Sequence, residues 1–331
     1  MDSEQHRSAG RPAKPRVSIG IPVYNGEAFV EGAINAALAQ TYTDFELVIS
    51  DNASTDRTEE ICREFARRDA RVKYVRAEQN QGAIWNFNRV FELSQGEYFK
   101  WAAADDLFLP TFLEKCAQVL DDNPSVIWCH TQSGKIDRYD QPLSVDDPAS
   151  DGAVHSSDDG LPRDFHQSPH RHERFRGVLL GTTWSADSYG LIRADALRQT
   201  CMLISCYGAE KVLIGALSLI GQYAEIPETL FYQRIHSSTA SNLNTASQQQ
   251  AYMDTQAKSR VALTRLRLLL GHFESVLHAK MSLLDRVMCF WEIAHYVFQV
   301  RKWMRIVSGT MKGAGLGKEG TVTPRSTKNA L

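Results

Sequence analysis

Short apolar segments alternate with helical patterns over the first 130 residues. The apolar segments, which are β-prone and end at turn residues, predict buried strands at 17–23, 45–50, 71–77, 97–104 and 125–130. Between them, apolar residues return at helical spacing and predict helices over 28–39, about 56–68, 82–95 and 110–120. Strands that alternate with helices predict an α/β fold, in which a mostly parallel sheet is covered by helices on both faces.

The pattern changes further along the chain. Residues from about 144 to 172 are rich in Asp, Ser, Pro and His, and predict a long mobile loop. A strand running into a helix is expected at 188–198, a helix at 209–221, a strand at 223–236, and helices from about 248 to 308. With a polar, disordered tail at 1–15, this predicts a main domain at 16–245 and a helical C-terminal extension at 246–331.

Composition narrows the class of protein. The 331 residues are 43% hydrophobic, which is enough for one large domain with an appendage. A formal net charge of −2 gives no electrostatic case for a nucleic-acid partner. The six cysteines form no Cys-x-x-Cys pair and indicate reduced thiols in a cytosolic protein. The sequence has no run of about 18 apolar residues, so no transmembrane helix is expected.

Polar clusters fall where the predicted strands end. They lie at Tyr24–Glu27, at Asp51–Asn52 and at Asp105–Asp106. Ligands of open α/β sheets bind at the carboxyl ends of the strands. Adjacent carboxylates suit Mg²⁺ or Mn²⁺, especially where a diphosphate completes the coordination shell. The alternatives are a helix cap for Asp105–Asp106 and an Asx-turn for Asp51.

Three later residues carry candidate chemistry. Glu210 opens an apolar helix, where the helix dipole favours a carboxylate. Arg234 and His236 close the last strand, and such groups bind phosphate oxygens. The alternatives are a first-turn Glu without a further role and a surface loop. The histidines of the predicted loop lack the spacing of a zinc site: His155, His166, His170 and His172.

These residues, in this order, resemble family 2 nucleotide-sugar glycosyltransferases of the GT-A fold. The resemblance covers roughly Val17 to Ser241, and its most specific part is the block SIGIPVYNGEAFVEGAINAALAQTYTDFELVISDNASTDRT. The segment NQGAIWNFN matches the N-x-G…N pattern of the family, and ADD at 104–106 stands at its DxD-type metal motif. The resemblance implies a Rossmann-like central sheet and an inverting transfer of a sugar.

The resemblance also implies roles for single positions. Glu210 aligns with the catalytic base, because A-E-K-V-L matches the E-D-x-x-L spacing of the family. Asp105 and His236 would hold Mn²⁺ or Mg²⁺ on the donor diphosphate. Asp51 would bind the base of the nucleotide. The other residues expected to bind the nucleotide-sugar are Pro22, Tyr24, Glu27, Asn80, Asn88, Asp106 and Arg234.

The chain departs from the family pattern at three positions. Ala103 replaces the first Asp of DxD, Phe87 replaces an Arg, and the base position holds Glu in place of Asp. A catalytically inactive sugar-nucleotide-binding or scaffold protein is therefore the alternative function. A nucleotidyltransferase is disfavoured, because IPVYNGE is not a Gly-rich phosphate loop.

The expected partners follow from the same resemblance. They are a nucleotide-sugar donor, with a UDP-sugar favoured, and a glycan or lipid-linked acceptor used in cell-surface glycan biosynthesis. Leu284, Val287, Trp291 and Phe298 fall near one helical stripe with basic residues beside them. This stripe favours either contact with a membrane surface or packing against the main domain or a second subunit of a homo-oligomer. The expected location is cytoplasmic, including the cytoplasmic face of a membrane.

Overall fold

The structure is a computed structural model that describes residues 14–143, 163–181, 186–236, 245–255 and 264–298. Most of the predicted tail and the predicted loop up to residue 162 lie outside the described residues. The described end of that loop forms a 3₁₀ helix, η2 (Arg163–Gln167), followed by the start of α5 (Arg171–Gly181). All six cysteines are free thiols.

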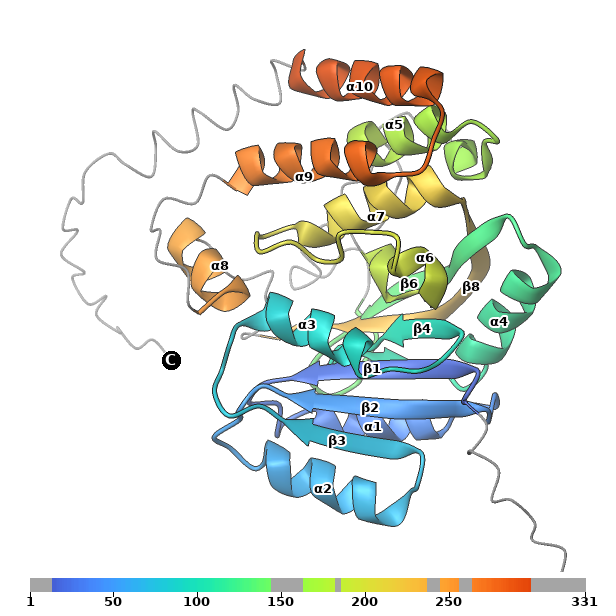
Figure 1. Cartoon of the computed structure of the whole chain (residues 1–331). Helices are drawn as coiled ribbons and strands as arrows, with labels where there is room; N and C mark the ends of the chain where they lie inside the picture. Colours follow the sequence, from blue (N-terminus) through green and yellow to red (C-terminus); the bar gives the residue numbers. More distant parts are fainter. Residues whose placement is uncertain (1–13, 144–162, 182–185, 237–244, 256–263, 299–331) are drawn as a thin grey trace, which may run out of the picture. The chain divides into compact units, whose positions relative to one another are not determined.

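The described strands form one sheet in the order β3-β2-β1-β4-β7-β6-β8-β5 (Figure 1). Strand β1 pairs in parallel with β2 and β4, β2 with β3, and β6 with β8, whereas β7 and β5 pair antiparallel. The predicted mostly parallel sheet is thereby confirmed. The bounds are β1 Val17–Val23, β2 Phe45–Asp51, β3 Val72–Arg76, β4 Tyr98–Trp101, β5 Leu107–Phe108, β6 Val126–Ile136, β7 Leu191–Arg193 and β8 Gln222–Arg234.

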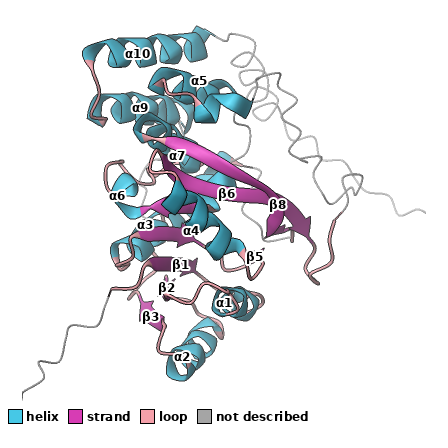
Figure 2. Cartoon of the chain, turned by 90° about the vertical axis from the view of Figure 1, so that its right-hand side faces the viewer, coloured by secondary structure: helices cyan, strands magenta, loops and turns pink. Residues whose placement is uncertain are grey.

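Helices cover both faces of the sheet, as the sequence predicts. Helices α1, α2 and α4 share one apolar core with the sheet, and α3, α6 and α7 share the other. Figure 2 shows α1 and α2 on one side of the strands and α7 and α9 on the other. The bounds are α1 Val30–Leu38, α2 Thr58–Arg68, α3 Ala83–Glu92, α4 Phe112–Asp122, α6 Ala194–Leu197 and α7 Ala209–Ile220, with a 3₁₀ helix, η3, at Ala186–Tyr189.

The side chains of β1 show how one strand serves two cores. Its odd-numbered residues, Val17, Ile19, Ile21 and Val23, all belong to the α1 core. Gly20 faces the opposite core, where a Cβ atom would lie 2.8 Å from Phe99 and 2.9 Å from Val90. The absence of a side chain at Gly20 therefore lets α3 and β4 pack closely against β1.

The register aligns the ends of the first strands. Val23 of β1 lies beside Asp51 of β2, and Asp51 lies beside Arg76 of β3. The turns that follow these strands consequently meet at one edge of the sheet. Strand β5 was not predicted from the sequence, because an element of two residues is too short to show a periodicity.

Within the described residues, the C-terminal region forms the helices α8 (Ala246–Met253), α9 (Thr264–His278) and α10 (Leu283–Phe298), and residues 279–282 interrupt the helix expected there. Ser282 caps α10 by accepting a hydrogen bond from the backbone N–H of Asp285 at 3.1 Å. The compact unit that contains the sheet, α8 and α9 extends to Ile293, and the residues from Ala294 onward form a separate unit. Among the helices described here, none has the length and apolarity to cross a membrane.

We expect Gly20→Val to destabilise the fold by about 1–3 kcal/mol, because the added side chain overpacks the core against Phe99 and Val90. Gly32→Ala is the matched control, since a Cβ atom there meets nothing closer than 3.9 Å and alanine favours the helix. Urea unfolding of both variants measures the difference. Equal stability of Gly20→Val and the wild type would show that the core yields at this position.

Candidate functional site

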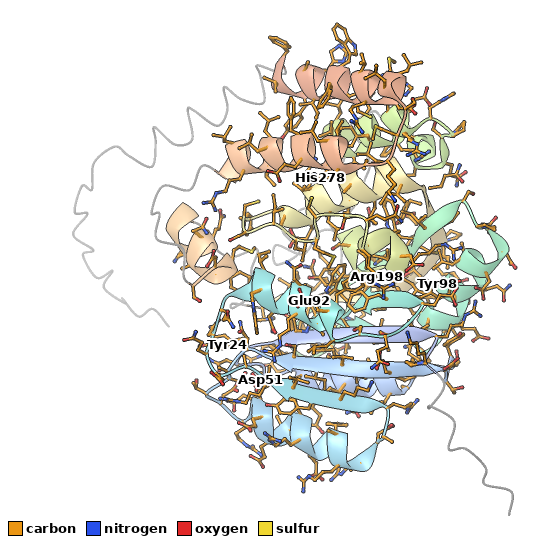
Figure 3. The ribbon with its side chains drawn as sticks, viewed as in Figure 1. Tyr24, Asp51, Glu92, Tyr98, Arg198 and His278 are labelled. Carbon is orange, nitrogen blue, oxygen red and sulfur yellow. The ribbon has the colours of Figure 1, made fainter. Side chains whose placement is uncertain are left out.

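The aligned strand ends place polar residues at one edge of the sheet. Figure 3 shows Tyr24 and Asp51 near each other at this edge, with Tyr98 at the opposite end of the strands. Tyr24 follows β1 and is 47% exposed, so its ring is available to a ligand. Pro22 lies in β1 itself, in the residue pair with Ser50 of β2.

The loops after β1 and β2 are joined by hydrogen bonds. Asn25, which has a φ of 50°, accepts a hydrogen bond from the backbone N–H of Thr55 at 2.8 Å. Its own N–H donates to Ser54 Oγ at 2.9 Å. Glu27 Oε2 accepts from the N–H of Arg57 at 3.0 Å, at the start of α2. These bonds hold the two loops together and thereby fix the loop in which Tyr24 and Glu27 lie.

Asp51 is fully buried and has partners for both carboxylate oxygens. Oδ1 accepts from the N–H of Ser54 at 2.8 Å, and Oδ2 accepts from the hydroxyl of Tyr74 at 2.6 Å. Arg76 Nε lies 3.7 Å from Oδ2. Burial and the hydrogen bond with Asp51 raise the pKa of Tyr74. The structural alternative raised for Asp51, a turn contact within DNAS, is therefore present, and base binding by Asp51 stays a prediction.

Asn80 and Asn88, which are predicted to bind the nucleotide-sugar, form hydrogen bonds that stabilise loops. Asn80 Oδ1 accepts from Asn52 Nδ2 and from the N–H of Gly82, both at 2.9 Å. Asn88 makes a two-point contact with the backbone of Leu203, donating to its carbonyl at 2.9 Å and accepting from its N–H at 3.1 Å. Asn88 thus ties α3 to the segment that precedes α7.

Another asparagine, Asn86 of α3, was missed by the sequence reasoning. Asn86 is buried, with 2% exposure, and its Nδ2 donates to the carbonyls of Ser50 at 2.8 Å and Val23 at 3.2 Å. Its Oδ1 accepts from Ser50 Oγ at 2.7 Å. Asn86 therefore fixes the ends of β1 and β2 to each other. A polar residue among the apolar positions of a helix was the available signal.

Asp105 and His236, both predicted to hold a metal ion, are brought together. His236 Nε2 lies 3.0 Å from Asp105 Oδ2, although the residues are 131 positions apart. The ring of His236 packs on Phe29 at 4.7 Å between centroids. No group of three or more His, Cys, Asp or Glu side chains that could hold a metal occurs in the part of the chain that the structure describes. A cation here would need further ligands from its substrate.

Asp106 and Arg234 support the turn that carries Asp105. Asp106 is buried, and its Oδ1 accepts from the N–H of Arg234 at 2.9 Å. Burial, followed by the charge of Asp105, raises the pKa of Asp106 well above its ordinary value. The Arg234 guanidinium donates to the carbonyls of Asp105 at 2.7 Å and Asp137 at 3.0 Å, and it pairs with Asp140. Both side chains thus have partners inside the protein.

A buried lysine next to this turn was also missed. Lys100 in β4 is fully buried and donates to the backbone carbonyls of Tyr189 and Trp101. Its Nζ lies 4.3 Å from the ring centre of Phe112. Burial lowers the pKa of Lys100 to about 7, and its charge lowers the pKa of Asp106. The isolated Lys in an apolar strand was a visible signal.

Glu210, predicted as the base, lies in the first turn of α7 after Gly208, whose φ is 81°. Its side chain lines a small recess together with Phe87, Trp101, Ser188, Tyr189, Leu203 and Leu213. Burial raises the pKa of Glu210 above its ordinary value, and no Lys or Arg among the described residues forms an ion pair with it. Burial, followed by the charges of Asp106, Glu210 and Asp105, raises the pKa of Tyr189. Trp101, which also lines the recess, is the last residue of β4, and the turn after β4 carries Asp105.

Two further tyrosines near Glu210 had no signal in the sequence. Burial and then the charge of Glu210 raise the pKa of Tyr207. Burial, followed by the charges of Asp105 and Glu210, raises the pKa of Tyr252 of α8 to about 12. The end of α8 is held to both sides of the site: Asp254 accepts from Ser205 Oγ at 2.9 Å, and Thr255 Oγ1 donates to the carbonyl of Asn80 at 2.8 Å.

The chain is similar in sequence to known proteins. The model of the protein family described as Glycosyl transferase family 2 matches residues 18–184. The chain is 36% identical over 115 residues to an uncharacterized glycosyltransferase of Rickettsia typhi, covering 34% of this chain and 35% of that protein. It is 34% identical over 102 residues to the putative teichuronic acid biosynthesis glycosyltransferase TuaG of Bacillus subtilis, covering 31% of this chain and 40% of TuaG.

The alignments therefore span well under half the length of these two relatives. Among solved structures, S. aureus TarS 1–349 in complex with UDP-GlcNAc superposes with a TM-score of 0.58 at 16% identity. The superposition covers 85% of this chain and 71% of that chain. At this identity the likeness concerns the fold, and it agrees with a GT-A-like sheet.

We expect Asn86→Ala to destabilise the protein by roughly 2–3 kcal/mol, because it leaves the buried carbonyls of Ser50 and Val23 without their donor. Asn35→Ala, at an exposed position of α1, is the control and should change stability by less than about 0.5 kcal/mol. Denaturant unfolding measures both. A loss no larger than that of the control would mean that water replaces the Asn86 amide.

Proposed function

The chain belongs to glycosyl transferase family 2, and on that premise we propose that it is an inverting glycosyltransferase. It moves a sugar from a nucleotide-diphosphate-sugar donor to an acceptor hydroxyl in the biosynthesis of a cell-surface glycan. One observation carries the proposal: the Glu210 carboxylate, without an ion pair in the described residues, lines a recess together with Trp101, the last residue before the turn that carries Asp105. A base and a diphosphate site would then lie at one edge of the sheet.

The donor would bind along the loops after β1, β2 and β3. Tyr24 and Glu27 lie in the loop after β1, Pro22 and Asp51 lie near the ends of β1 and β2, and Asn80 lies in the loop after β3. A UDP-sugar is the favoured donor, since the TarS structures of similar fold contain UDP or UDP-GlcNAc. The TuaG relative supports a place in glycan biosynthesis.

Asp105 and His236 are ligand types that suit a divalent cation. Asp105 supplies a carboxylate oxygen and His236 an imidazole nitrogen, 3.0 Å apart, and Asp106 and Arg234 hold their backbone in place. Mn²⁺ or Mg²⁺ bound there would offset negative charge on the diphosphate as a Lewis acid. Asp106 and Arg234 would act on the donor indirectly, by positioning Asp105.

Glu210 would act as the general base. Its carboxylate takes the proton of the acceptor hydroxyl while that oxygen forms a bond to the anomeric carbon. The bond from the anomeric carbon to the diphosphate oxygen breaks, and the nucleoside diphosphate leaves with the electron pair. A raised pKa suits a base that works near neutral pH. Tyr207 and Tyr252, which lie close enough to sense the charge of Glu210, would contact the acceptor.

An inactive sugar-nucleotide-binding protein is the second candidate. Ala103 stands where the family motif has its first Asp, and the described residues hold no cluster of three metal ligands. Both functions predict nucleotide binding, but only the enzyme turns over its donor. Release of free nucleoside diphosphate from a nucleotide-sugar, measured with Mn²⁺, separates the two.

We expect Glu210→Gln to lower kcat by about 10²–10⁴-fold with little change in donor affinity, because it removes the base and keeps the shape of the side chain. Glu92→Gln, at an exposed position of α3, is the matched control. Steady-state transfer kinetics and donor titration measure the two effects. Near-normal turnover of Glu210→Gln would assign the base elsewhere.

The raised pKa of Glu210 also predicts two pH effects. The acid limb of kcat/KM should lie above the ordinary pKa of Glu, because protonation inactivates the base. A buried carboxyl with a raised pKa stabilises the fold only while it is protonated, and this stability is lost as the pH rises through the folded-state pKa. Glu210→Gln should therefore raise Tm at neutral pH, and the gain should vanish below the unfolded-state pKa.

We expect UDP with Mn²⁺ to raise Tm by roughly 5 °C or more at saturating concentrations, and UDP alone to raise it less. Asp105→Ala and His236→Ala should each remove the Mn²⁺-dependent part, since these side chains supply the protein ligands. Asp195→Ala, with a 91% exposed side chain, is the control. Thermal melts with UDP, GDP, dTDP and CMP measure the preference, and a larger shift with another nucleotide would contradict the choice of UDP.

A further inference from the structure

Helix α9 exposes a stripe of large apolar residues on its outer side. Leu266, Leu270, Phe273 and Leu277 recur at helical spacing and are 39–54% exposed. The opposite side of the same helix is buried: Gly271, His272, Ser275 and Val276 have little exposure, and a Cβ atom at Gly271 would meet Val212 of α7 at 3.0 Å. The apolar stripe therefore lies on the side of α9 that α7 does not cover.

The part of α10 before Ala294 repeats this arrangement. Leu283, Leu284, Val287 and Trp291 are 55–78% exposed, whereas Cys289 and Ile293 are buried. The rings of Phe273 and Phe290 pack at 5.0 Å between centroids, so the two helices are in contact. Large apolar side chains that gather in this way on a soluble domain mark an interaction surface. We call these eight exposed residues of α9 and α10 the apolar face.

The sequence after the apolar face is strongly basic. Residues 299–331 contain seven Lys or Arg and a single acidic residue, Glu319, in a chain whose net charge is −2. A basic segment that follows exposed Leu, Phe and Trp side chains in the sequence matches the chemistry of an anionic lipid surface. Trp is also the residue type that favours the membrane–water interface. A second copy of the chain fits less well, because a symmetric contact would bring two basic segments together.

We propose that the apolar face rests on a membrane surface that contains anionic lipids, and that the basic segment 299–331 adds electrostatic attraction. The contact would lie behind the helix that carries Glu210, since α9 packs on α7 and Arg267 donates to the carbonyl of Ser205 at 2.9 Å. The recess of Glu210 and the loops of the donor side are built from other segments. Membrane binding is therefore separable from catalysis.

Flotation of the full chain with lipid vesicles tests the proposal. The chain should float with vesicles of phosphatidylcholine and phosphatidylglycerol, and less with phosphatidylcholine alone. Leu284→Ser/Trp291→Ser should weaken partitioning roughly tenfold or more, because both side chains are exposed apolar contacts. Tyr139→Ser, at a 70% exposed aromatic residue outside the apolar face, is the matched control and should float like the wild type.

The charge contribution has its own variant. Arg301→Gln/Lys302→Gln/Arg305→Gln should reduce the preference for anionic vesicles, and added salt should do the same to the wild type. Failure of the wild type to float, or equal flotation of the Leu284/Trp291 variant, overturns the proposal. A dimer in light scattering that this variant converts to a monomer, without flotation, would assign the face to a second copy. Donor turnover is not used in any of these measurements.

Discussion

The backbone N–H of Arg234 donates a hydrogen bond to the buried carboxylate of Asp106, and the arrangement of the site depends on this contact. It fixes the turn after β4 to the end of β8, two segments that are 128 residues apart. The Arg234 side chain reinforces it by donating to the carbonyl of Asp105. Asp105 Oδ2 lies 3.0 Å from His236 Nε2, so these contacts hold the turn from which Asp105 reaches His236.

Asparagines perform the same task at the neighbouring strand ends. Asn86 binds the backbone of β1 and β2, Asn80 binds the loop that enters α3, and Asn88 binds the segment before α7. An amide both donates and accepts, so it can join two backbone segments without placing a charge in the interior. Three such residues on or beside one helix link the nucleotide side of the proposed site to the helix that carries Glu210.

The site contains buried ionisable groups, whose burial is energetically unfavourable. Asp106 and Glu210 have pKa values raised by burial, and Lys100 has a pKa lowered to about 7. Each group would be more stable as a neutral side chain or in water. Their presence at one edge of the sheet agrees with a functional role, since perturbed ionisable groups gather at active sites. The apolar face of α9 and α10 is a separate cost, because it leaves large side chains in water.

Local pattern alone determined the strands β1 to β4, the helices between them and the turns that carry Tyr24, Asp51 and Asp105, because periodicity and turn chemistry act over a few residues. The resemblance to a family added the roles expected of Glu210 and His236. The tertiary structure decided the rest: the pairing of β5 with β8, the cage around Lys100, the internal partners of Arg234 and the place of Tyr252. These contacts join residues far apart in the chain, and no local pattern encodes such distances.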